Sequence, residues 1–398
     1  MRTAAALLLL AVPTFVPRLD DPRIRYYEAA PRDLVADLDR RLADGTAKLE
    51  FGEKWGYLES VLRELKVPVS SQALVFSKTS LQVAKISPEH PRAIYFADDV
   101  YVAMVRGGLI ELAAVDPTLG AVFYTLEQKK AAQPRLLRRN AECLNCHFTV
   151  NTSYVPGFLT RSVHANAAGE PMVESGSYLT DHHSPIVQRW GGWYVTGTHG
   201  AERHLGNVFA NGSGKVDVER GANVVDLKGR VNAAQYPVPS SDLVALLVLN
   251  HQVQLHNLIT RLGYEFRLGR TEWKDTVESV VRYMLFADEA QLRYPVAGTS
   301  PFRAEFEARG PADGRGRSLR QMDLDHRLFR YPCSYLIYSE SFDALPDEPK
   351  QAVYRRIWEI LNVTGPLAGY GRLSADDRRA ILEILAATKP GLPAYFRP

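Results

Sequence analysis

Cysteine is scarce in this chain: its 398 residues contain only Cys143, Cys146 and Cys333. A disulfide framework of the kind that stabilises small secreted proteins is therefore excluded. The sequence also lacks an internal repeat, a low-complexity segment and a block of like charges, and its formal net charge is only +3. These absences argue against a solenoid protein and against nucleic-acid binding.

Two of the three cysteines stand in the stretch CLNCH, residues 143–147. Two cysteines separated by two residues, with a histidine directly after the second, have the spacing of c-type haem attachment. The alternatives are a zinc site, which would need a second ligand pair, and a disulfide or dithiol. A thioredoxin-like pair should follow a strand and open a helix, whereas this pair follows the basic, loop-like stretch KKAAQPRLLRRN.

Through Cys143, Cys146 and His147 the chain resembles the c-type cytochromes. The resemblance implies one covalently bound haem c, with thioether bonds from Cys143 and Cys146 and with His147 as the proximal iron ligand. It covers the motif and the helix that the motif opens. In layout the chain is similar to large single-haem proteins of bacteria, which extend on both sides of one such motif. No second CxxCH is present, so a multihaem electron wire is not expected.

The N-terminus reads MRTAAALLLLAVPTFVPRLD, where one arginine precedes an apolar run from Ala4 to about Val16. This pattern predicts a secretory signal peptide over residues 1–20. The run is shorter than the roughly 20 apolar residues that cross a bilayer; an uncleaved anchor is the alternative, and only then would the chain contact a membrane. Because haem thioethers form on the outer side of the bacterial cytoplasmic membrane, we expect a periplasmic or otherwise exported protein.

Hydrophobic periodicity predicts an α+β fold, with helical N- and C-terminal regions flanking a small antiparallel β meander and a haem-binding, loop-rich centre. After the signal peptide the expected regions are 21–90, N-terminal helices; 91–240, the meander with the haem-binding part; and 241–398, C-terminal helices. The strongest expected helix is apolar almost all round, starts near Pro239 with Ser240 or Ser241, and ends at Gly263.

The sixth iron ligand determines which function we expect. A methionine raises the reduction potential, a histidine lowers it, and an open position permits ligand binding or catalysis. The candidates lie in the irregular segment 148–215, and they are Met172, His182, His183, His199 and His204. We select His199 as the metal ligand opposite His147, because it stands in a glycine-bounded loop after the expected strand WYVTG.

Several other residues have expected roles near the haem or in the core. Two haem propionates need cations, and the candidates that follow the motif are Arg161, Arg189 and Arg203. His251 and His256 are five residues apart on the buried helix, about 140° around its axis, so they do not form an i, i+4 metal pair. We expect both to be hydrogen-bonded core residues; the alternatives are a lining of the haem pocket and a second metal site.

The expected function is periplasmic electron transfer through one haem, with an unidentified redox partner protein. The alternative is a haem enzyme or small-molecule sensor with an open iron site, similar in chemistry to a peroxidase. Bacterial dihaem peroxidases use a second haem that this sequence does not encode. Whether the chain is an enzyme stays open at this point.

Overall fold

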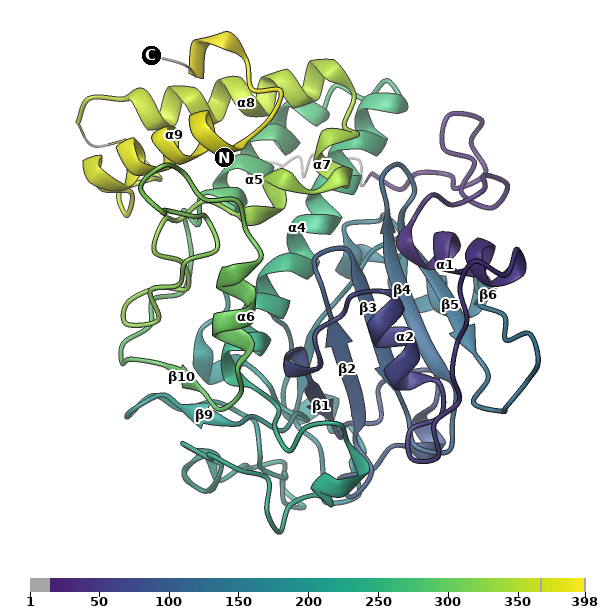
Figure 1. The fold of residues 1–398 in the computed structure, drawn as a ribbon. Coiled ribbons are helices and arrows are strands. Elements are labelled where there is room, and N and C mark those ends of the chain that lie inside the picture. Colours follow the sequence, from purple (N-terminus) through teal and green to yellow (C-terminus); the bar gives the residue numbers. More distant parts are fainter. Residues whose placement is uncertain (1–14, 366, 397–398) are drawn as a thin grey trace, which may run out of the picture.

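The computed structural model of the chain describes residues 15–365 and 367–396 (Figure 1). Most of the predicted signal peptide, residues 1–14, lies outside the described part. The remaining residues of that predicted segment include Phe15 and Leu19, which are buried. Among the described residues, no helix combines the length and the apolar character needed to cross a bilayer.

The nine α-helices and ten strands of the described residues have the following bounds. The helices are α1 (Leu34–Ala43), α2 (Leu58–Glu64), α3 (Ala141–His147), α4 (Leu243–Arg267), α5 (Trp273–Met284), α6 (Phe302–Ala308), α7 (Glu340–Asp343), α8 (Asp347–Asn362) and α9 (Ala375–Thr388). The strands are β1 (Ala73–Val75), β2 (Arg92–Phe96), β3 (Val100–Met104), β4 (Ile110–Asp116), β5 (Gly120–Leu126), β6 (Leu137–Arg138), β7 (Arg161–Val163), β8 (Ser177–Leu179), β9 (Gly197–Thr198) and β10 (Ala297–Gly298).

A six-stranded antiparallel sheet, in the order β1-β2-β3-β4-β5-β6, forms one half of the molecule (Figure 1). The predicted meander is confirmed in β2 to β5, and the short strands β1 and β6 extend it on either side. One face is covered by α1 and α2, where the Tyr124 hydroxyl donates to Asp33 at 2.6 Å. The other face packs against α3, α4 and the chain that follows α3.

Helix α4 is the long central helix, and it differs from its prediction at both ends. Asp242 caps its start by accepting hydrogen bonds from the backbone N–H groups of Val244 and Ala245. The predicted end at Gly263 is wrong: the helix continues to Arg267, and the left-handed Gly269 (φ +69°) follows its last turn. Both glycines fit the stop signal, but only the second adopts the conformation that ends a helix.

The hydrophobic core is one continuous cluster that runs from Phe15 to Phe396. It crosses the predicted region boundaries at residues 90 and 240, because α4 packs against both the sheet and the helices α5, α7 and α8. The α+β class is confirmed. The stretch between β6 and α4 is mainly loops and short turns, as expected for the loop-rich centre, and it contacts α4 through Asn250, His251 and Asn257.

Candidate functional site

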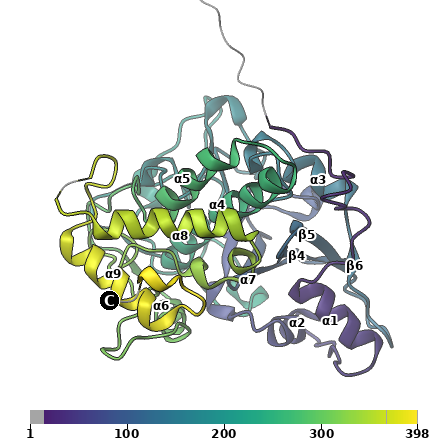
Figure 2. The ribbon, with the colours of Figure 1, turned by 90° about the horizontal axis from the view of Figure 1, so that it is seen from above.

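The CLNCH motif makes up the last five of the seven residues of α3, so it ends this helix and does not open it as expected; the helix begins shortly after β6. Helix α3 is anchored by the buried Leu144. Cys143 is half-buried, Cys146 is exposed, and both are reduced. Residues three and four apart lie on the same helical face, so Cys143, Cys146 and His147 present their side chains along one stripe. Figure 2 shows α3 close to β5 and far from α9.

The imidazole of His147 is held by a backbone carbonyl. Its Nδ1–H donates to the Gly157 carbonyl oxygen at 2.9 Å, and its ring packs on Phe123 with 4.7 Å between ring centroids. Burial lowers the pKa of His147 to about 4. The ring is therefore neutral at pH 7, with Nδ1 protonated and the lone pair on Nε2, which is the form that binds metals.

An apolar, partly open wall adjoins the motif. Ala113 on β4 is paired with Phe123 on β5, and Ile94 on β2 reaches the same face through the register of β2, β3 and β4. Ile94, Ala113 and Cys143 are only partly buried, although they pack against the core. This sheet face therefore offers apolar surface next to the two thiols, as a flat hydrophobic group bound to them would require.

Two arginines that sequence reasoning missed lie close enough to act electrostatically on the motif. Arg92 forms an ion pair with Glu111 at 2.8 Å, its Nε atom is buried without a partner, and its charge lowers the pKa of His147. Arg139 opposes the rise in the pKa of Cys143, which burial raises to about 11. Sequence proximity could have indicated Arg139, whereas sheet pairing brings Arg92 from 55 residues upstream.

The three arginines proposed from sequence have other partners. Arg161 donates to the Ser177 hydroxyl at 2.9 Å. Arg189 is buried and donates to the carbonyls of Ser184 and His182. Arg203 forms an ion pair with Glu219 at 2.8 Å. None of these contacts involves α3.

The structure does not bring His199 to His147. The backbone before His199 is bonded to the start of α4, where Leu243 donates to Thr196. The Gly157 loop instead packs on Asn257 of α4, which is 14 residues, or about 21 Å, further along the helix. Both ring nitrogens of His199 are also occupied: Nδ1–H donates to the Glu202 carbonyl at 2.8 Å, and Nε2 accepts from the Asn223 N–H at 3.0 Å. We therefore do not retain His199 as the second axial ligand.

The other histidine candidates also have partners away from the motif. His204 accepts from the Gly206 N–H at 2.9 Å and packs against His199. His182 contacts His251 of α4, and His183 lies 3.6 Å from the Asp181 carboxylate. Met172 is partly buried at the turn between β7 and β8, and it stays a candidate.

The two histidines of α4 are hydrogen-bonded core residues. The Nε2 atom of His251 lies 2.8 Å from the Ser334 hydroxyl, and that of His256 donates to the Asp98 carbonyl at 2.8 Å. Cys333 is fully buried beside Ser334. Its burial raises the pKa of the thiol to about 12, so it is a core side chain and not a reactive thiolate.

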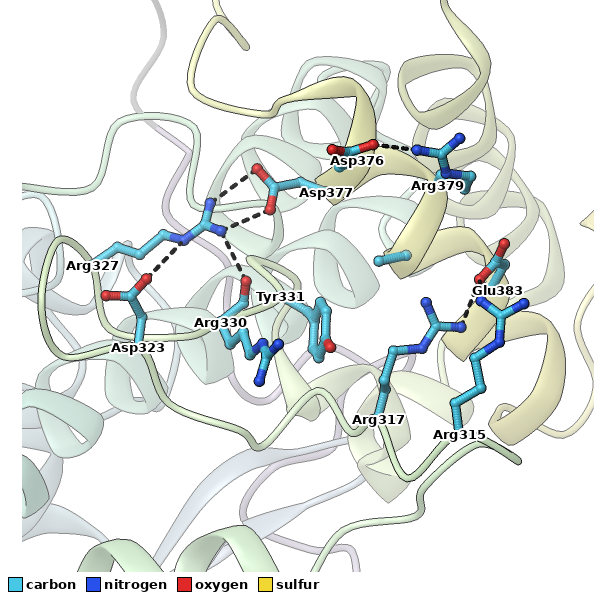
Figure 3. A pocket seen from close by; sticks show the side chains of 11 residues that line it. Arg315, Arg317, Asp323, Arg327, Arg330, Tyr331, Asp376, Asp377, Arg379 and Glu383 are labelled. Atoms are coloured by element: carbon cyan, nitrogen blue, oxygen red, sulfur yellow. Dashed lines mark hydrogen bonds and ion pairs between the residues drawn. The ribbon is translucent and has the colours of Figure 1, made fainter.

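A separate hollow of about 470 Å³ lies between α9 and the loop around residues 313–331 (Figure 3). Its arginines are largely neutralised by neighbouring carboxylates. Arg327 binds Asp377 through two hydrogen bonds of 3.1 and 2.7 Å, and Arg315 and Arg317 share Glu383. This arrangement ties α9 to the loop beneath it.

The groups on α3 fit a covalently bound haem c. Two thiols and a neutral imidazole lie along one helical stripe, the imidazole has a carbonyl partner on its non-ligating nitrogen, and apolar sheet surface adjoins them. Within residues 15–365 and 367–396, no group of three or more His, Cys, Asp and Glu side chains is placed to hold a metal ion.

No protein-family model matches the chain, and neither the curated proteins nor the solved structures include a match. The basis for a function is therefore the chemistry of the residues themselves.

Proposed function

We propose that the chain is an exported c-type haem protein that transfers single electrons to or from a partner protein. Cys143 and Cys146 would carry the thioether bonds, and the Nε2 atom of His147 would bind the iron. Bound haem would supply a one-electron Fe(III)/Fe(II) couple. The cations available for its propionates are Arg92 and Arg139.

The observation that carries this proposal is the hydrogen bond from His147 Nδ1–H to the Gly157 carbonyl. Histidines that bind metals usually donate their second ring N–H to a carboxylate, a carbonyl or a water, which fixes the tautomer and the ring orientation. In this chain the CxxCH histidine already has that partner. A short sequence match alone would not require such a contact.

The exposure of Cys146 supports electron transfer. This cysteine lies at the protein surface, and close to it in sequence Val150 is 65% exposed. A thioether at Cys146 would place one haem edge near solvent, where a partner can approach. Weak redox encounters commonly bury less than about 1,200 Å² in total, so a small apolar contact around Cys146 and Val150 is sufficient.

The test is production of the mature protein with c-type maturation, followed by the haem stain of a denaturing gel. Covalent haem is expected in the unsubstituted protein and should be absent from the Cys143→Ala, Cys146→Ala double variant. Cys333→Ala is the matched control, because this third thiol is buried away from α3. Full covalent haem in the double variant would overturn the proposal.

A second candidate function is ligand binding or catalysis at an open iron position. It is favoured by the hydrogen bonds that hold His199 and His204 away from His147. Ferric spectra separate the two candidates. A low-spin signal would show a second protein ligand and support electron transfer, whereas a high-spin signal that shifts with cyanide would support the open site.

A further inference from the structure

One peptide group connects His147 to a buried asparagine on α4. The Gly157 carbonyl accepts from His147 Nδ1–H at 2.9 Å, and the N–H of the same peptide group, that of Phe158, donates to Asn257 Oδ1 at 2.8 Å. Asn257 also donates from Nδ2 to the Phe158 carbonyl at 2.7 Å. The asparagine, the peptide and the imidazole therefore form one hydrogen-bonded chain.

The packing leaves this peptide little freedom. The Gly157 N–H donates to the His147 carbonyl at 2.9 Å, so residues 147 and 157 are joined by two hydrogen bonds. A Cβ atom at Gly157 would overlap Oδ1 of Asn257. Asn257 itself is buried, with 1% of its surface exposed. The two ends of this series of hydrogen bonds, His147 on α3 and Asn257 on α4, are thus fixed in position.

Hydrogen bonds in series polarise one another, because a peptide whose N–H is bound presents a more negative carbonyl oxygen. A stronger acceptor at Gly157 draws the Nδ1 proton of His147 and makes the imidazole a stronger electron donor through Nε2. A stronger donor stabilises ferric over ferrous iron and so lowers the reduction potential.

We propose that Asn257 is a positioning residue that sets the reduction potential of the haem through the Gly157–Phe158 peptide and His147. This inference depends on the proposed function, since it needs His147 to be an iron ligand. None of the hydrogen bonds of Asn257 involves His147. The effect of Asn257 would reach the histidine only through the peptide.

The test compares Asn257→Leu with the unsubstituted protein by redox titration. Leucine has a similar volume but removes the acceptor for the Phe158 N–H, so the equilibrium constant for reduction should rise about tenfold. This change corresponds to about 59 mV for a one-electron couple. A potential equal to that of the unsubstituted protein would overturn the inference.

Asn250→Leu is the matched control. Asn250 lies two turns earlier on the same face of α4, is equally buried, and bonds Thr160, Thr180 and Trp190 instead of the Gly157–Phe158 peptide. Both leucine variants should lower the melting temperature, but only Asn257→Leu should raise the potential. Equal rises in both would mean that the effect is a general loss of packing.

Asn257→Asp keeps an oxygen acceptor toward the Phe158 N–H and makes it a stronger, charged one, so it should lower the potential. This variant decides the question even if the leucine variant does not fold, because an unchanged or raised potential in Asn257→Asp would also overturn the inference. The two proposals fail in different ways. Unsubstituted protein without covalent haem would refute the proposed function, whereas haem-bearing Asn257 variants with an unchanged potential would refute only the role of Asn257.

Discussion

The Nδ1 atoms of His182 and His251 lie 2.8 Å apart, at the contact of two buried rings that stack almost in parallel. Only one of the two nitrogens carries a proton there, so each ring depends on the tautomer of the other. His182 also stacks on Tyr283, with 3.8 Å between centroids, and His251 continues the chain to Ser334. The two histidines and Tyr283 thus connect the loop-rich segment between β6 and α4 to helices α4 and α5.

This contact should be visible as an energetic coupling. His182→Phe keeps an aromatic ring on Tyr283 but removes the partner of His251, and it should cost about 1–3 kcal/mol. His251→Leu should cost at least as much, because it leaves both His182 and Ser334 without their partner. In urea unfolding, the free energy of unfolding should fall less in the double variant than the sum of the decreases in the two single variants. Strictly additive losses would show that the two rings are independent.

The buried histidines make the haem-free protein acid-sensitive. Burial lowers the pKa of His204 and His251 to about 3 and that of His256 to about 4. An unfolded histidine titrates near 6.5, so as the pH falls below that value the unfolded chain binds protons first. Stability is then lost by up to about 1.4 kcal/mol per pH unit for each histidine, until the folded pKa is reached.

Two buried carboxyls oppose this loss. Burial raises the pKa of Asp99 and Glu289 to about 7, so the folded chain takes up these protons first as the pH falls below 7. Histidines with a lowered pKa are more numerous; they are His147, His182, His199, His204, His251 and His256. The melting temperature should therefore be lower at pH 5 than at pH 7.5, and calorimetry that finds it equal or higher would contradict this balance.

In the proposed haem protein, His199→Ala should leave the spin state of the iron unchanged. Both ring nitrogens of His199 already have partners, and the loop sits near the opposite end of α4 from the motif. The variant should lose stability through the contacts to Glu202 and Asn223, which melting measurements will register. Met172→Ala is the comparison, because Met172 stays a candidate ligand. A change from low-spin to high-spin iron in His199→Ala would show that the placement of this loop differs in the haem-bearing protein.

One ion pair that lines the hollow beneath α9 should stabilise the folded protein. Arg327 and Asp377 are mostly buried, so Arg327→Met should lower the free energy of unfolding by about 1–2 kcal/mol. Arg379 and Asp376 line the same hollow but are exposed, and Arg379→Met should change the melting temperature little. Equal effects in the two variants would remove the distinction between buried and exposed pairs.

Local patterns in the sequence were sufficient for the elements that depend on local residues. Short β-branched or aromatic runs separated by turn residues predicted strands β2 to β5, and an apolar stretch of helical length predicted α4. The cysteine spacing drew attention to α3 because CxxCH is itself a local signal. The end of α4 was misplaced because Gly263 and Gly269 give the same signal, and only the folded backbone distinguishes them.

Contacts between residues far apart in the sequence could not be predicted from local patterns. Arg92 reaches the motif through the pairing of three strands, and Asn257 reaches His147 through a loop that folds back onto α4. His199 was selected for its glycine-bounded loop, but its neighbours there, Glu202 and Asn223, use both of its nitrogens. The sequence shows which polar groups are present, but not which of them already have hydrogen-bond partners.

The short strand β6 has a consequence for how the thiols become accessible. Its two residues, Leu137 and Arg138, pair with β5, the Arg139 N–H adds one bond to the Phe123 carbonyl, and α3 begins at Ala141. Releasing this edge and unwinding seven residues would free Cys143 and Cys146 while β1 to β5 stay paired. Under the proposed function, the attachment machinery would need to open only this small corner of the protein, and haem could be attached without unfolding of the sheet.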